Sequence, residues 1–326
     1  MTWILGIDGG GTHTRALIAN AEGAVLGVGK AGSSNYHTVG ITQAVRAVAD
    51  AIDAARTAGR VHGQASGAFL GLAGVRTAAD HLAFREPLAA LGLVKSSERL
   101  GLDHDLRIAL AGGCGDRPGI VVIAGTGSAA YGRDRNGVTA QSGGWGWLLD
   151  DQGGGTWFAL KGLRAVMEAA DGRGPRTRLE PALFAELGVT SAREAMQWTM
   201  RPDTARSQLA ALAPVVLAAA EDGDKVAAAL MIEGARQLSR MAAALVEPLD
   251  FGGDPISVVP AGGLLGHAEY LSAFRSALEK TGHPFLLVES PVPPIGGAAF
   301  LAADLAGITL TEEARRRIGE ASRAVL

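Results

Sequence analysis

The chain has 326 residues, 48% hydrophobic and only 5% aromatic, which fits about two domains whose cores are built from aliphatic side chains. A formal net charge of −3 offers no basic surface for nucleic acid, and the single cysteine, Cys114, excludes an intrachain disulfide and a multi-cysteine metal site. No apolar run approaches the roughly 20 residues of a membrane span, and no leader-like segment opens the chain, so we expect a cytoplasmic protein without membrane partners.

The first predicted elements form a meander of strands. An apolar run at 3–8 predicts a strand, and after a glycine-rich stretch two further strands are predicted at 14–20 and 24–30. Because a strand and not a helix follows the glycines, the pattern indicates antiparallel hairpins. The rest of this half predicts a polar loop at 32–40, a helix at 41–58, a strand at 67–75, and helices at 77–91 and 106–110.

The opening pattern then returns about 115 residues later. An apolar strand at 119–124 ends in the glycine turn 125–128, and strands at 129–133 and 138–142 follow. Internal duplication predicts a fold with two similar halves. The remaining sequence predicts helices at 154–170, 192–200, 204–221, 225–247 and 267–281, strands at 256–260 and 284–290, a proline-marked helix within 291–307, and a charged helix at 311–324.

The glycine stretch "DGGGT", residues 8–12, has more glycine than a hairpin turn needs. The chain has no Walker P-loop string, and the one Rossmann-like match, at 27–32, opens a polar loop and no helix. Glycines leave backbone N–H groups free to surround an anion, and a carboxylate such as Asp8 suits the hydrated Mg²⁺ of a nucleotide. The stretch therefore predicts a phosphate-binding hairpin.

Three glycine motifs together resemble a known superfamily. Asp8–Thr12, Gly125–Ser128 and Ala261–Gly263 resemble the two phosphate motifs and the adenosine motif of the actin, Hsp70 and sugar-kinase superfamily. Within it, "GLAG" at 71–74 and "GGWGWLLDDQGGGTW" at 143–157 resemble the BadF/BadG/BcrA/BcrD-type ATPase family, which includes N-acetylglucosamine kinase. The resemblance runs in order from residue 4 to about residue 303.

The resemblance implies an α/β fold with two similar ribonuclease H-like (actin-like ATPase) domains, mixed sheets flanked by helices, and an interdomain cleft. It places one domain at 1–118 plus 294–326 and the other at 119–293. It also implies ATP and Mg²⁺ as cofactors, with Asp8 holding the Mg²⁺ through water. The residues it implies for ATP binding are Asp8, Gly10, Gly11, Thr12, Gly125, Thr126, Gly127, Ser128, Gly262 and Gly263.

Phosphoryl transfer to a sugar also needs a base for the attacking hydroxyl. In the resembling kinases this is an Asp at the start of a helix just before the second phosphate strand, a position that Asp105 matches. Asp105 could instead only cap that helix, and Asp103 is the alternative base. His104 is expected to be a neighbour of the base.

The resemblance implies sugar contacts by Asn35, Gly144, Trp145 and Asp151, together with Asp105. Asn35 could instead be an ordinary turn residue, and Trp145 a core anchor. The family string Gly-Asp-Glu-Gly-Ser is replaced here by Asp150-Asp151-Gln152-Gly153-Gly154. An extra acid favours a cationic amino sugar, so the choice between N-acetylglucosamine and glucosamine stays open.

We therefore expect an ATP-dependent amino-sugar kinase, acting on the 6-hydroxyl of N-acetylglucosamine, with glucosamine as the alternative substrate and a homodimer as its assembly. An ATPase that activates a partner enzyme is the alternative from another class, although the single cysteine fits poorly with the iron–sulfur cluster of such activators. A sugar-responsive regulator would carry an N-terminal DNA-binding module, which we do not expect before a first motif at residue 8.

Overall fold

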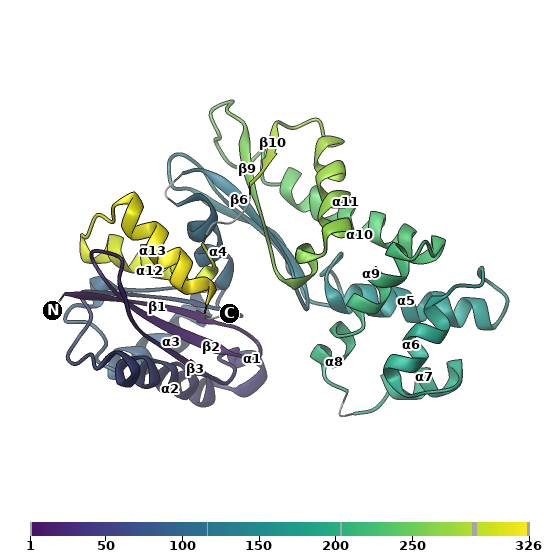
Figure 1. Ribbon diagram of the computed structural model, residues 1–326, viewed down its shortest axis with the longest axis horizontal. Helices are drawn as coiled ribbons and strands as arrows, with labels where there is room; N and C mark the ends of the chain where they lie inside the picture. Colours follow the sequence, from purple (N-terminus) through teal and green to yellow (C-terminus); the bar gives the residue numbers. More distant parts are fainter. Residues whose placement is uncertain (1, 116, 203, 289–291, 325–326) are drawn as a thin grey trace. The chain divides into compact units, whose positions relative to one another are not determined.

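The computed structural model describes residues 2–115, 117–202, 204–288 and 292–324. The chain divides into two compact units, Met1–Arg117 with Glu289–Leu326, and Pro118–Val288. The boundaries predicted from the sequence lie at 118/119 and 293/294. Each unit is built on its own five-stranded sheet with helices packed against it (Figure 1).

The sheet of the first unit has the strand order β3-β2-β1-β4-β5. Strands β1, β2 and β3 are antiparallel neighbours, whereas β4 and β5 run parallel to β1. The parallel strands need crossover connections, and helices supply them. The bounds are β1 Trp3–Gly9, β2 Thr14–Asn20, β3 Val25–Ala31, β4 Gly67–Leu72 and β5 Leu100–Asp103.

Alternation along β1 sends its side chains into two separate cores. Trp3, Leu5 and Ile7 pack with α2 and α3, while Ile4 packs with α12 and α13 on the opposite face. The helices of this unit are α1 Tyr36–Val39, α2 Ile41–Gly59, α3 Ala78–Ala90, η1 Ser97–Arg99, α4 Asp105–Cys114, α12 Pro294–Ala306 and α13 Glu312–Arg323. The two last helices therefore lie beside strands from the start of the chain (Figure 1).

Glycine permits the close approach of α12 to the sheet. A Cβ added at Gly6 in β1 would lie 2.6 Å from the backbone nitrogen of Ala299, a distance at which no side chain fits. Gly29 in β3 has the same role toward α2, because its Cβ would lie 2.5 Å from the nitrogen of Ala55. These glycines are explained by packing alone.

The second unit repeats the topology of the first, with strand order β10-β9-β6-β7-β8. Again three antiparallel strands come first and two strands parallel to the leading strand follow, so the predicted duplication is confirmed. The strands are β6 Gly119–Ala124, β7 Ser128–Arg133, β8 Thr139–Gly143, β9 Ile256–Ala261 and β10 Phe285–Leu287. The helices are α5 Gly155–Ala170, α6 Leu179–Leu187, α7 Ala192–Thr199, α8 Arg206–Ala210, α9 Ala213–Glu221, α10 Lys225–Ala243, η2 Gly263–Gly266 and α11 Ala268–Glu279.

The structure corrects some of the predicted elements. The single helix predicted at 204–221 is two helices, because the chain breaks after Ala210 and α9 restarts with Pro214 in its first turn. The short strand β5 and the helix α6 were not predicted. The strand predicted at 284–290 is shorter, and its residues 289 and 290 lie outside the described residues, as does residue 291 of the proline-marked segment. Within the described residues, no helix combines the length and apolarity needed to cross a membrane.

Candidate active site

The first glycine loop is the tip of the β1–β2 hairpin. The Gly10 nitrogen donates to the His13 carbonyl oxygen at 2.8 Å, which leaves Gly11 and Thr12 as the exposed tip. Packing explains Gly9, whose Cβ would lie 2.5 Å from Leu72. It does not explain Gly11, which has ordinary φ and nothing within 4 Å of an added Cβ. A glycine that the fold does not need fits a backbone that must stay open to a ligand.

Asp8 lies at the end of β1, opposite Arg15 on β2. The two side chains form an ion pair of 3.7 Å and are only 16% and 18% exposed. Burial, and then the nearby carboxylate of Asp105, raise the pKa of Asp8 to about 6, while Arg15 lowers it. The structure thus brings together two residues, Asp8 and Asp105, that are almost a hundred positions apart in sequence.

The strand register explains this meeting. Asp8 pairs with Gly71 on β4, and Gly71 leaves space for Ile108 of α4, whose Cδ1 would lie 2.5 Å from an added Cβ. Helix α4 therefore lies close over this face of the sheet. Its first residue is Asp105, which the helix start presents near the end of β1.

The start of α4 is organised by His104 and not by Asp105. His104 is the N-cap, and its buried ring accepts a hydrogen bond through Nδ1 from the backbone nitrogen of Arg107 at 3.2 Å. Its Nε2 lies 3.5 Å from an Asp103 carboxylate oxygen. Burial lowers the pKa of His104, whereas it raises the pKa of Asp105, an effect that His104 and Arg76 oppose. Asp105 is therefore not the N-cap of α4, and its Oδ1 accepts from the nitrogen of the next residue, Leu106, at 3.0 Å.

The loop before α1 is tied to the first glycine hairpin. The Ser34 nitrogen and the Ser33 hydroxyl both donate to the Gly10 carbonyl oxygen, at 3.3 Å each. Asn35 is the N-cap of α1, and its Oδ1 accepts from the His37 nitrogen at 3.2 Å. The amide nitrogen of the Asn35 side chain has no acceptor among the residues that the structure describes. The predicted sugar contact and the predicted phosphate hairpin are therefore parts of one connected structure.

The second glycine loop joins β6 to β7 and rests on the start of α5. The carbonyl oxygens of Gly125 and Thr126 accept from the nitrogens of Gly155 and Thr156, at 2.7 and 3.0 Å. Gly125 has open space around an added Cβ, as Gly11 does in the first loop. Ser128 is different, because it is buried and its hydroxyl donates to the Gln152 carbonyl oxygen at 2.7 Å.

The third glycine loop follows β9 and lies against the second. β9 pairs with β6, and Gly262, with a φ of +85°, lies so close that an added Cβ would be 2.6 Å from the carbonyl carbon of Ala124. Gly262 is thus required by the fold, whereas Gly263 has open space. The predicted second phosphate motif and adenosine motif are neighbours at one edge of the second sheet.

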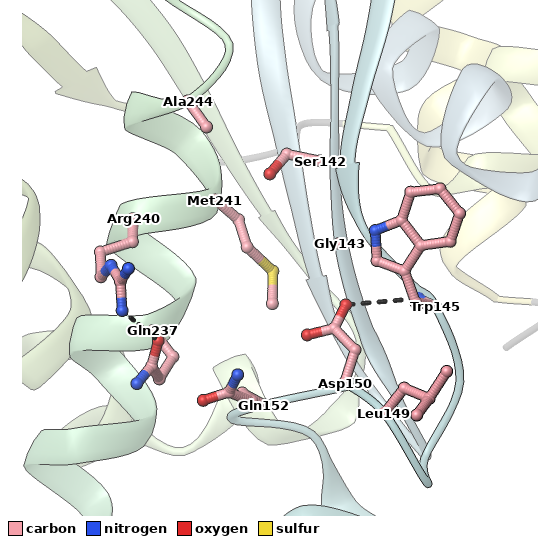
Figure 2. A pocket seen from close by; sticks show the side chains of 10 residues that line it. All are labelled: Ser142, Gly143, Trp145, Leu149, Asp150, Gln152, Gln237, Arg240, Met241 and Ala244. Atoms are coloured by element: carbon pink, nitrogen blue, oxygen red, sulfur yellow. Dashed lines mark hydrogen bonds between the residues drawn. The ribbon is translucent and has the colours of Figure 1, made fainter.

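The "GGWG" stretch forms the wall of a cavity of about 450 Å³ in the second unit (Figure 2). Gly143, Gly144 and Gly146 all have φ values of +75° to +93°, which favour glycine. Trp145 is 79% exposed, so it is not a core anchor. Figure 2 shows α10 facing this loop across the cavity, with Met241 and Gln237 opposite Asp150. The cavity is lined by Ser142, Gly143, Trp145, Leu149, Asp150, Gln152, Gln237, Arg240, Met241 and Ala244.

The two neighbouring aspartates of the motif have different surroundings. Asp150 lines the cavity and accepts a hydrogen bond from the Trp145 nitrogen at 3.3 Å. Asp151 is only 6% exposed at its side chain, has a φ of +55°, and forms an ion pair with Arg206 of α8. Its Oδ2 would lie 2.5 Å from a Cβ added at Gly127 in the second glycine loop. No sequence motif pointed to Arg206.

Two domains of one topology, each with a glycine turn after its leading strand, define the class of actin-like ATPases. A family model of the BadF/BadG/BcrA/BcrD ATPase family matches residues 5–302, so the chain belongs to that family.

Named relatives cover most of the chain. It is 31% identical over 280 residues to an N-acetylmuramic acid/N-acetylglucosamine kinase of Clostridium acetobutylicum, covering 85% of this chain and 90% of the relative. It is 29% identical over 310 residues to an N-acetyl-D-glucosamine kinase of Dictyostelium discoideum, with 91% and 97% covered. A solved Chromobacterium violaceum structure, proposed to be an N-acetylglucosamine kinase, superposes with a TM-score of 0.75 at 27% identity, covering 93% of this chain and 99% of that one.

Proposed function

We propose that this protein is an ATP-dependent kinase that phosphorylates an amino sugar, N-acetylglucosamine at its 6-hydroxyl. The observation that carries the proposal is the meeting of Asp105, at the first position of α4, with Asp8 beside the glycine hairpin. A base candidate and a metal-orienting candidate are the pair that a sugar kinase needs. The similarity to named N-acetylglucosamine kinases supports the choice of substrate.

In the proposed reaction Asp105 accepts the proton of the sugar 6-hydroxyl. The O6 oxygen forms a bond to the γ-phosphorus of ATP as the bond from that phosphorus to the β-bridging oxygen breaks. The products are the sugar 6-phosphate and ADP, with the proton on the Asp105 carboxylate. Burial raises the pKa of Asp105, which makes the ionised carboxylate a stronger proton acceptor than an exposed one.

ATP is proposed to bind through the glycine loops, with Gly11, Gly125 and Gly263 offering backbone that no packing requirement explains. The residues present fit a Mg²⁺ ion that travels with the nucleotide. Asp8 is a carboxylate beside a second carboxylate, yet the described residues contain no group of three ligands that would form a cage without phosphates. Asp8 would hold the ion through water, and the ion would neutralise phosphate charge.

The sugar is proposed to contact Asn35, Gly144 and Trp145, with Asp151 as a further predicted contact. The exposed indole of Trp145 offers a flat apolar wall of the kind on which a sugar ring packs. Glucosamine is the second candidate substrate, because the extra acid Asp150 lines the same cavity as Trp145 and would attract an ammonium group.

The test is a screen of ADP release over N-acetylglucosamine, glucosamine, N-acetylmannosamine, N-acetylmuramic acid and glucose. We expect strong stimulation by N-acetylglucosamine and none by its 6-deoxy analogue, which lacks the acceptor oxygen. Stimulation by no sugar would refute the kinase proposal and favour an ATPase that activates a partner. We also propose a cytoplasmic homodimer, on the family resemblance alone, which light scattering of the purified protein and cell fractionation would check.

A further inference from the structure

The ion pair between Arg206 and Asp151 lies on the second glycine loop. A Cβ added at Gly127 would lie 2.5 Å from Asp151 Oδ2 and as close to the Arg206 guanidinium. Both groups therefore contact the backbone of the loop itself, where the phosphates of ATP are proposed to bind. From this placement we infer that Arg206 is a phosphate-binding residue and that Asp151 positions it, an inference that rests on the proposed function.

Helix α8 holds Arg206 at this place. Ala210, at the end of α8, packs on the start of α5, since its Cβ would lie 3.0 Å from a Cβ added at Gly155. Gly155 in turn donates to the Gly125 carbonyl oxygen of the loop at 2.7 Å. The short helix and the glycine loop thus share one support, which fixes where the guanidinium reaches.

The burial of the pair indicates which side faces a ligand. The Asp151 side chain is 6% exposed, whereas that of Arg206 is 39% exposed. Asp151 accepts a hydrogen bond from one guanidinium nitrogen, Nη2. Within the described part of the chain the other terminal nitrogen has no acceptor, so it can bind a phosphate oxygen. The buried Nε has no hydrogen-bond partner among the described residues. Arginine presents its donors in a planar fork that matches phosphate oxygens, which makes it suited to this contact.

Charge gives an independent reason. A nearly buried carboxylate on a phosphate loop would repel ATP if nothing compensated it. Arg206 neutralises the charge of Asp151, and the exposed part of the Arg206 guanidinium remains a cationic hydrogen-bond donor beside the loop. A carboxylate can accept several hydrogen bonds, so the pair with Arg206 is compatible with the proposed contact of Asp151 to the sugar.

The experiment measures binding of ATP, ADP and adenosine to the full chain without sugar, by titration calorimetry. We expect Arg206→Gln to weaken ATP and ADP binding on the order of 10- to 100-fold, the usual range for a hydrogen bond to a charged group, and to leave adenosine binding within about twofold. Arg206→Lys keeps the charge without the fork and is expected to fall between. Exposed Arg193 on α7 supplies the matched control, and Arg193→Gln is expected to change none of the three affinities.

Asp151→Asn tests the positioning role in the absence of sugar. We expect it to weaken ATP binding less than Arg206→Gln does, and the double variant to bind ATP no more weakly than Arg206→Gln alone. The inference is overturned if the ratio of ATP to adenosine affinity is unaltered in Arg206→Gln, and the positioning role of Asp151 is overturned if Asp151→Asn binds ATP as tightly as wild type. If circular dichroism shows Arg206→Gln unfolded, the ratio in Arg206→Lys decides. If the wild-type protein phosphorylates a sugar but Arg206→Gln leaves the ratio of ATP to adenosine affinity unaltered, this inference alone is refuted. If the wild-type protein binds no ATP, the proposed function is refuted as well.

Discussion

Replacing Asp105 by Asn removes the proposed proton acceptor and keeps the shape of the side chain. We expect turnover to fall by about 10²- to 10⁴-fold, the range for a positioned acid–base group, which corresponds to roughly 3–5 kcal/mol of transition-state free energy. Sugar and ATP affinities should change little, because an amide can keep a hydrogen bond to the sugar hydroxyl.

The structure also limits the effect of Asp105→Asn on stability. The first turn of α4 loses a favourable negative charge, worth about 0.3–1 kcal/mol, but Asp8 loses a repulsive neighbour. His104 remains as the N-cap of α4. We therefore expect the free energy of unfolding to change by less than about 1 kcal/mol. Since burial is the larger cause of the raised pKa of Asp8, that pKa should fall only part of the way toward 3.8.

The assay is coupled ADP release at saturating sugar, with urea unfolding as the check on folding. Asp103→Asn is the matched variant, because Asp103 is the neighbouring carboxylate and contacts His104. We expect Asp103→Asn to keep turnover within about tenfold of wild type, well short of the loss expected for a base. Loss of turnover in Asp103→Asn together with retained turnover in Asp105→Asn would refute the assignment of the base.

Three further predictions follow from the site. Asp8 ionises near pH 3.8 when unfolded and near 6 when folded, so its contribution to stability is fully present below pH 3.8 and is lost as the pH rises through 6. This loss is about 3 kcal/mol of the free energy of unfolding. Thermal unfolding between pH 4 and 7 should therefore show a smaller decline in stability for Asp8→Asn than for wild type, and equal declines would contradict the raised pKa. Gly11→Val, at an open position with ordinary φ, should abolish ATP binding in calorimetry yet leave the melting temperature nearly unchanged, and ATP affinity equal to wild type would remove Gly11 from the phosphate site. Asp150→Asn should reduce kcat/KM for glucosamine more than for N-acetylglucosamine, and an equal reduction would show that Asp150 does not select the amine.

Much of the fold follows from local sequence pattern. The two strand–glycine–strand meanders are visible because buried strands and glycine turns have strong local signals. Their repetition predicted two similar halves, which the matching sheet orders confirm. The break between α8 and α9 was missed because an alanine-rich segment has helical propensity on both sides of it. The short β5 has only half-buried residues, which leaves no alternation to detect.

The candidate site was predictable where a motif carries its chemistry. Asp8 was predicted from its position after a strand and Asp105 from the family resemblance, and the structure places the two carboxylates close enough to interact electrostatically. Arg206, for which we propose phosphate binding, was not predicted, because an arginine in a helical segment has no signature and its position depends on how α8 packs on α5. The orientation of Asp151 was equally hidden, since it depends on a left-handed backbone at a non-glycine residue.

The return of α12 and α13 to the first unit has a consequence for the order in which a growing chain can fold. Ile4, Leu17 and Ala19 bury against helices that begin at Pro294, whereas the whole second unit is continuous in sequence. About 200 residues must be synthesised after Arg117 before that apolar face is covered as far as Ile318, which takes roughly 10–40 seconds at ordinary rates of translation. On the ribosome, the second unit can thus complete its core first, and the N-terminal sheet is the part of the nascent chain that a chaperone would need to shield.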